Sequence, residues 1–179
     1  DIVYVAAIGH AWTDNPERGL FKTVDGGDTW KHVLAISDQT GVVDLVMDPQ
    51  DPETLYASAW HKTRYKMGGP KSGIYKSTDG GENWKRLGGG LPENTDLGRS
   101  GLAVAVSNPN VVYAFIDNHS PSGDRIIGAE VYRSNDKGET WKRTHEKSLY
   151  EVFTQYGWKF TNIHIVPGNE NELFILGNR

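Results

Sequence analysis

The sequence predicts an all-β fold made of repeated antiparallel units, and three observations point to it. One eight-residue pattern, Ser/Thr-x-Asp-x-Gly-x-Thr/Asn-Trp, occurs at residues 23–30, 77–84 and 134–141. Each copy lies between two alternating, strand-like segments, which is typical of a β-hairpin. The aspartates of successive copies are 54 and 57 residues apart, which fits one supersecondary unit per repeat.

The residue types of the pattern suit a tight turn. We expect an aspartate on the buried side of the turn to accept hydrogen bonds from backbone N–H groups, and the glycine two residues later to adopt a positive φ. The tryptophan then covers the turn. Because an enzyme rarely needs the same acid three times, a catalytic role for the aspartates is the weaker alternative. The residues given this structural role are Asp25, Gly27, Trp30, Asp79, Gly81, Trp84, Asp136, Gly138 and Trp141.

The repeated pattern resembles the Asp-box of the BNR repeat, which occurs in sialidases, xyloglucanases and sortilin-type proteins. Longer stretches, such as YVAAIGHAW at residues 4–12 and SGIYKSTDGGENWKRLGGGLP at residues 72–92, resemble bacterial sortilin-like (glycosyl-hydrolase-like) proteins. This resemblance covers nearly the whole chain. It implies a β-propeller in an extracytoplasmic location, which means secreted, periplasmic or on the cell surface.

Alternation and turn signals predict thirteen strands and no convincing helix. They lie at residues 2–8, 19–24, 29–34, 42–47, 54–60, 73–78, 83–87, 101–106, 111–117, 130–135, 140–144, 160–166 and 172–176. Aligned on the repeats, they form three strands of one blade (1–34), two complete blades (35–88 and 89–145) and two strands of the next (146–179).

This number of blades cannot close a ring, because propellers use about four to eight blades. We therefore expect a segment of one longer propeller, a partial β-propeller of four-stranded blades whose partners are the remaining blades of a parent chain. The alternative is assembly with other copies or other chains. Its open faces would expose apolar side chains, which favours association. The side chains expected there include Ile2, Val5, Ile163 and Leu173.

Composition excludes several classes of function. The 179 residues carry a net charge of −4 and no cysteine, so we predict neither nucleic-acid binding nor a disulfide framework. No apolar run approaches the roughly 18 residues of a membrane span. The six histidines lack the spacing of a zinc motif. We predict no metal and no cofactor.

Antiparallel strands place the Asp-boxes at one end of each blade. The other end has the long loops 9–18, 61–72 and 118–129 and the connections between blades, 35–41, 89–99 and 145–159. Binding residues tend to lie on such variable loops, and these loops carry the cations and aromatic rings expected for carbohydrate or peptide recognition. The alternative is that the tryptophans only pack the loops. The candidate ligand-binding residues are His10, Trp12, Arg18, Trp60, His61, Arg64, Tyr65, His119, Tyr156 and Trp158.

These observations favour a non-catalytic propeller segment that binds a peptide, protein or glycan through its long loops. The alternative is part of a glycoside hydrolase propeller, xyloglucanase-like or sialidase-like, and a pure assembly scaffold is a third possibility. Xyloglucanase-type hydrolysis needs two carboxylates flanking the sugar bond. Loop carboxylates lie outside any catalytic motif that we can match, so the identity of any catalytic residue stays open. They include Asp14, Glu17, Asp96 and Asp124.

Overall fold

The computed structural model describes residues 1–10, 12–93, 96–153 and 161–177. This part of the chain contains thirteen β-strands and one short 3-10 helix, Tyr150–Phe153. The all-β prediction is therefore confirmed. Within the same residues, no helix has the length and apolar character needed to cross a bilayer.

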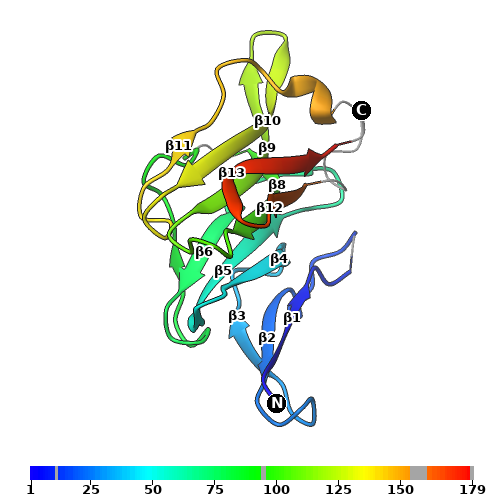
Figure 1. The fold of residues 1–179 in the computed structure, drawn as a ribbon. Coiled ribbons are helices and arrows are strands. Elements are labelled where there is room, and N and C mark those ends of the chain that lie inside the picture. Colours follow the sequence, from blue (N-terminus) through cyan, green and yellow to red (C-terminus); the bar gives the residue numbers. More distant parts are fainter. Residues whose placement is uncertain (11, 94–95, 154–160, 178–179) are drawn as a thin grey trace.

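The strands form four antiparallel sheets that follow one another in chain order (Figure 1). Blade 1 contains β1 (Val3–Ala7), β2 (Gly19–Thr23) and β3 (Lys31–Leu34). Blade 2 contains β4 (Thr40–Asp48), β5 (Asp51–His61), β6 (Gly73–Ser77) and β7 (Lys85–Arg86). Blade 3 contains β8 (Leu97–Val104), β9 (Val112–Ser122), β10 (Arg125–Ser134) and β11 (Lys142–Arg143). Blade 4 contains β12 (Asn162–Val166) and β13 (Asn169–Leu176).

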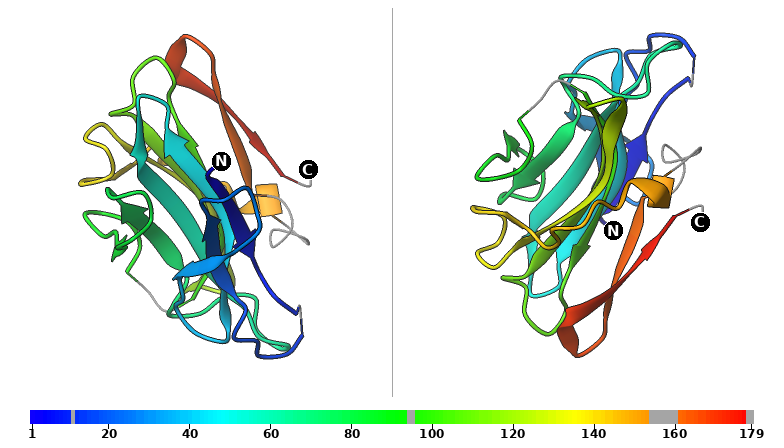
Figure 2. Two further views of the ribbon diagram at one scale, coloured as in Figure 1. Left: turned by 90° about the horizontal axis from the view of Figure 1, so that it is seen from below. Right: turned by 90° about the horizontal axis from the view of Figure 1, so that it is seen from above.

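Two complete blades are thus flanked by two partial ones, and the partial-propeller prediction is confirmed. Within each blade, strands that are adjacent in sequence are also adjacent in the sheet. The first strands of three successive blades, β4, β8 and β12, contact one another in the same order. The sheets fan out from these inner strands and leave an open arc (Figure 2).

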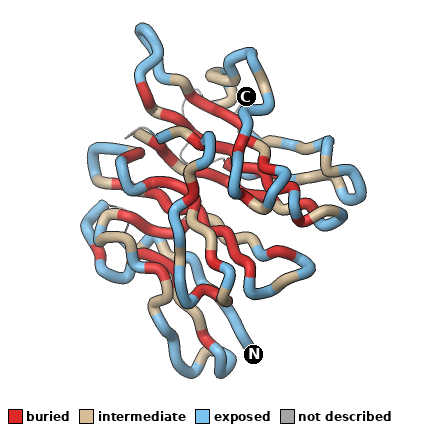
Figure 3. Tube along the Cα trace, turned by 90° about the vertical axis from the view of Figure 1, so that its left-hand side faces the viewer, coloured by how far each residue is buried: buried red, intermediate tan, exposed pale blue. Residues whose placement is uncertain are grey.

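The hydrophobic core lies between blades. Its largest cluster joins blades 2 and 3, and includes Tyr56, Ile74, Leu102 and Trp141. Two further clusters join blade 1 to blade 2 and blade 3 to blade 4. Buried residues consequently concentrate in the central sheets, whereas β1 and β13 are largely exposed (Figure 3).

Each Asp-box is organised around a buried hydroxyl. In the second box, Ser77 Oγ accepts hydrogen bonds from the backbone N–H groups of Gly81 (2.9 Å) and Asp79 (3.3 Å), and donates one to Asp79 Oδ1 (2.8 Å). Asp79 also accepts bonds from the side chain and the backbone of Asn83, at 2.7 and 2.9 Å. Hydrogen bonds from Asn83 and Ser77 lower the pKa of Asp79 to about 2.

The other two boxes repeat this arrangement at Thr23, Asp25 and Thr29, and at Ser134, Asp136 and Thr140. The expectation of an aspartate on the buried side is wrong. The hydroxyl two residues earlier is the buried group, and the carboxylate lies at the surface. A hydroxyl can donate and accept at once, so the same group accepts hydrogen bonds from backbone N–H groups and donates one to the carboxylate.

The glycine and tryptophan of each box have the structural roles that the sequence predicts. The glycines have positive φ, and the indole Nε1 of each tryptophan donates to the glycine carbonyl of its own box at 2.9–3.1 Å. The pairs are Gly27 with Trp30, Gly81 with Trp84, and Gly138 with Trp141.

Two further expectations are corrected by the structure. Residues 118–129 are not a loop, because β9 and β10 continue as a hairpin that projects beyond the blade (Figure 1). A buried bond from Asn118 Nδ2 to Glu130 Oε2 (2.8 Å) supports this longer pairing, and Gly123 supplies the positive φ of its turn. Ile163 is buried rather than exposed, because β12 packs against blade 3.

Candidate functional site

The long loops gather at the end of the blades opposite the Asp-boxes. We call this end the long-loop face and define it by residues 8–18 and 62–72, together with the β9–β10 hairpin. The structure brings the first two of these segments into direct contact, since Arg18 of blade 1 bonds the carbonyl of Lys62 in blade 2 at 2.8 Å.

Arg18 binds the loops of two blades together. Only 3% of the residue is exposed, and its guanidinium donates to four backbone carbonyls at 2.8–3.0 Å. Two acceptors, His10 and Thr13, belong to its own loop, and the other two, Gln39 and Lys62, belong to blade 2. Burial lowers the pKa of Arg18. The structure therefore gives this candidate a positioning role beneath the surface.

Trp60 and His61 also lie below the surface of this face. The buried Trp60 donates its indole N–H to the carbonyl of Met67 at 2.8 Å and so holds the loop after β5. His61 Nε2 lies 3.1 Å from Gln39 Oε1, and burial lowers the pKa of His61. Its Nδ1 is buried without a hydrogen-bond partner among the described residues.

Two aromatic rings remain exposed above this layer. Trp12 is 55% exposed and Tyr65 is 89% exposed. Lys62 Nζ lies 4.0 Å from the centroid of the Trp12 ring, and Arg64 lies 5.5 Å from that of Tyr65. Cations at these distances are attracted to the ring faces. The long-loop face thus presents two aromatic surfaces on adjacent blades, each accompanied by a cation.

Blade 3 joins the same face through polar contacts. Lys66 Nζ forms an ion pair with Asp96 Oδ1 at 2.5 Å. His119 Nε2 lies 2.7 Å from Asp117 Oδ2; although burial acts against it, this contact raises the pKa of His119. The candidates Tyr156 and Trp158 lie outside the described residues.

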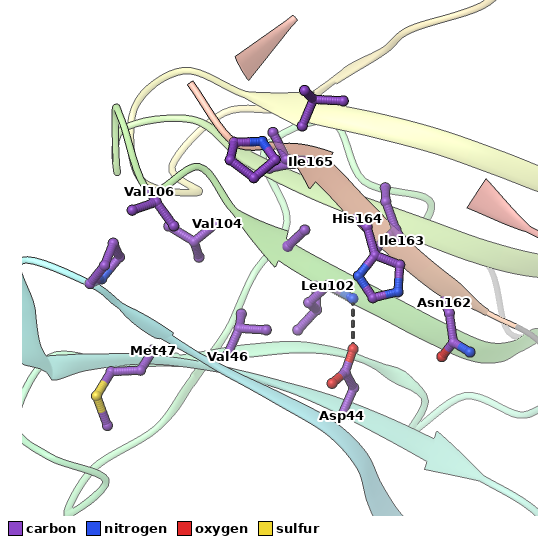
Figure 4. Close-up of a pocket in the computed structure, with 14 residues that line it drawn as sticks. Asp44, Val46, Met47, Leu102, Val104, Val106, Asn162, Ile163, His164 and Ile165 are labelled. Carbon is purple, nitrogen blue, oxygen red and sulfur yellow. Dashed lines mark hydrogen bonds between the residues drawn. The ribbon is translucent and has the colours of Figure 1, made fainter. Parts of the chain in front are cut away.

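Sequence reasoning missed a polar group inside the open centre of the arc. A cavity of about 500 Å³ is lined by the inner strands β4, β8 and β12, and Asp44 points across it toward Leu102 and His164 (Figure 4). The Leu102 N–H donates to Asp44 Oδ2 at 2.8 Å. Burial raises the pKa of Asp44, although the charge of Arg99 on β8 opposes this effect.

The local backbone helps to set the directions of the Asp44 and Arg99 side chains. The pairing register of β4 shifts between Val42 and Asp44, and that of β8 shifts between Leu97 and Ser100, next to Arg99. Such bulges re-aim side chains in a strand. The sequence signal that could have identified Asp44 is its place as the single carboxylate within the otherwise apolar run at residues 42–47.

Replacing Asp44 should change how stability depends on pH. Because the folded-state pKa of Asp44 is raised, the native state binds this proton more tightly than the unfolded chain. Its contribution to stability therefore declines as pH rises from about 4 through the folded-state pKa. We expect the difference in unfolding free energy between Asp44→Asn and the wild type to change in favour of the variant as pH rises. Urea unfolding at a series of pH values between 3.5 and 7 measures this difference. For the exposed control Asp38→Asn, the curve of stability against pH should run parallel to that of the wild type. A parallel curve for Asp44→Asn would contradict the role assigned to Asp44.

A family model and two curated proteins match this chain. Residues 75–86, which contain the second Asp-box, match the model of the BNR/Asp-box repeat. A protein of Neosartorya fischeri named as a probable oligoxyloglucan-reducing end-specific xyloglucanase is 26% identical over 141 residues, which cover 69% of this chain and 16% of that protein. A Paenibacillus xyloglucanase is 28% identical over 159 residues, which cover 80% of this chain and 13% of the enzyme. The chain thus spans about a sixth or less of these relatives' length.

Solved structures show the same fold. The GH74 enzyme of Niastella koreensis superposes with a TM-score of 0.64 at 18% identity, over 98% of this chain and 27% of the enzyme. An ancestral GH74 enzyme gives a TM-score of 0.58 at 16% identity, over 97% of this chain and 21% of the enzyme. The closer resemblance to sortilin-like proteins stays a prediction. The chain therefore carries the BNR/Asp-box repeat within a partial β-propeller, and its sequence is similar to those of xyloglucanases.

Proposed function

We propose that this chain is a segment of a glycoside hydrolase propeller and that its long-loop face binds a glucan chain of xyloglucan type. The sequence similarity to two xyloglucanases supports the substrate class. Hydrolysis needs two carboxyl groups on either side of the scissile bond, and we assign it to the whole propeller. We also infer an extracytoplasmic location, which the family resemblance implies.

The exposed ring of Trp12 is the observation that carries the binding proposal. An indole that is 55% exposed leaves much apolar surface in water, and a large apolar ring with a polar edge is well suited to an interface. The flat, hydrogen-rich faces of pyranose rings stack on such surfaces. Tyr65 offers a second ring on the same face, and the exposed Arg64 supplies donors for sugar hydroxyls.

Calorimetric titration with xyloglucan oligosaccharides tests this proposal. We expect Trp12→Ala to weaken binding at least about tenfold, which is ~1.4 kcal/mol, and Tyr65→Ala to weaken it as well. Neither substitution should shift the melting temperature much, because both rings are exposed. Trp30→Ala is the matched control, since Trp30 is 45% exposed but lies in an Asp-box at the opposite end. Normal binding by Trp12→Ala would refute the proposal.

Non-catalytic binding of a peptide or protein is the second candidate. The loop at residues 62–72 favours it, because its exposed Arg64 and Tyr65 combine a guanidinium fork with an amphipathic ring. That pair suits a carboxylate of an acidic peptide. Titration of an acidic peptide in parallel distinguishes the two candidates. If the chain binds peptides, Arg64→Ala should reduce peptide binding, and the oligosaccharide should produce no heat.

A further inference from the structure

Blade 1 holds the Asp-box of blade 2 through three side chains. Tyr4 Oη donates to the carbonyl of Gly80 at 2.8 Å. Lys22 and Lys31 form ion pairs with Glu82, at 3.4 and 2.5 Å. Glu82 lies three residues after the box aspartate. Its pKa is lowered by these lysines, Lys31 first.

Blade 2 holds the Asp-box of blade 3 in the same way. Tyr56 Oη donates to the carbonyl of Lys137 at 2.9 Å, and Lys76 and Lys85 lie 2.9 and 4.0 Å from the carboxylate of Glu139. In both blades the tyrosine and the two lysines lie on successive strands, β1, β2 and β3 in blade 1 and β5, β6 and β7 in blade 2. We call this set of three side chains the clamp.

Blade 3 carries a third clamp, made of Tyr113, Arg133 and Lys142. Each lies 57 residues after its counterpart in blade 2, the same interval that separates Asp79 from Asp136. These three side chains line an open cavity of about 640 Å³, and no Asp or Glu is among the described residues that line it.

Among the residues that the structure describes, no carboxylate occupies the third clamp. Arg133 Nη1 instead contacts the amide oxygen of Asn171 at 2.6 Å, and Tyr113 Oη donates to the carbonyl of Glu170 at 2.8 Å. In the described part of the chain, Lys142 makes no ion pair. The third clamp is therefore a positively charged site whose two counterparts each hold a glutamate.

An open strand edge lies beside this cavity. In blades 2 and 3 the second strand pairs with a third strand, as β5 pairs with β6. Within the described residues, β13 pairs only with β12, and Leu173 of β13 lines the cavity. An unpaired edge accepts an added strand through backbone hydrogen bonds. The cavity and the edge therefore suit one hairpin, whose first strand pairs with β13 and whose turn reaches the clamp.

We propose that the cavity between blade 3 and β13 is a docking site for an Asp-box hairpin that carries a carboxylate three residues after its aspartate. The occupied clamps also define a required glycine. A Cβ on Gly138 would lie 3.1 Å from Leu87 and 3.3 Å from Tyr56, so a side chain there would crowd the clamp tyrosine, and the φ of 86° also favours glycine. The ligand pattern is thus Ser/Thr-x-Asp-x-Gly-Glu/Asp-Thr/Asn-Trp.

A peptide from this chain tests the proposal directly. Residues 73–86 contain a third strand, an Asp-box and Glu82, and a fluorescent version can be titrated with the full 179-residue chain by anisotropy. We expect saturable binding that weakens about tenfold when the peptide carries Glu82→Gln, and by a similar factor when the chain carries Lys142→Ala. The matched control is Lys71→Ala, which removes an exposed lysine elsewhere and should leave binding unchanged.

Two results would overturn the proposal. The first is no saturable binding up to about 1 mM peptide, and the second is binding that ignores both Glu82→Gln and Lys142→Ala. Occupation by a second copy through Asp28, the corresponding acid of the first box, would instead support the proposal, because the first box also fits the ligand pattern. In that case sedimentation velocity would show dimers that dissociate with either Asp28→Asn or Lys142→Ala, and the cavity would be a self-association site.

Discussion

Trp141→Ala should lower the free energy of unfolding by about 3–5 kcal/mol, the range for removing a large buried aromatic side chain. Trp141 is 4% exposed and packs in the cluster between blades 2 and 3. Trp30 occupies the same position in the first box and makes the same indole bond, but it is 45% exposed. Trp30→Ala should therefore cost less than about 1 kcal/mol.

Urea unfolding followed by circular dichroism measures both substitutions on the same scale. The bond within the box is common to the two variants, so their difference reports the contact with the neighbouring blade. Equal losses of stability would mean that the tryptophan acts only on its own turn. The packing between blades would then not be the main source of stability.

Arg18→Met should lower the free energy of unfolding by about 2–4 kcal/mol, because buried partners of a charged group are left unpaired. Four carbonyls of two blades each lose a hydrogen bond from the guanidinium. Hydrogen exchange should accelerate in residues 10–18 and 62–72. The exposed control Arg64→Met should stay within about 0.5 kcal/mol of the wild type.

The same variant separates a positioning role for Arg18 from direct ligand contact. A positioning role predicts lower stability, with oligosaccharide binding weakened only through the disordered loop. If Arg18→Met keeps its stability but no longer binds the oligosaccharide, then Arg18 contacts the ligand, as its residue type alone suggested.

The repeat made the architecture predictable from the sequence. Three copies at a nearly constant spacing define the number of blades, and the number of strands follows from alternation between the copies. The spacing does not reveal which atoms hold each turn. The buried hydroxyl of Ser77 and the surface carboxylate of Asp79 differ from our expectation, because either residue type can accept the same backbone N–H groups.

The long-loop face was harder to predict in detail. Residue type places Arg18, Trp60 and Trp12 in one group, yet the first two are buried and the third is exposed. That division depends on contacts across blades, such as the bond from Arg18 to the Lys62 carbonyl, which a local pattern does not contain. Asp44 was missed for a related reason, because a bulge in β4 and the neighbouring blade together set its surroundings.

Hydrogen–deuterium exchange with and without a saturating xyloglucan oligosaccharide is the most direct test of the proposed binding face. We expect slower exchange in residues 8–18 and 62–72 when the oligosaccharide is bound. The Asp-box turns at residues 23–30, 77–84 and 134–141 should exchange at unchanged rates. Slower exchange in the Asp-box turns, with none in the long loops, would contradict the account.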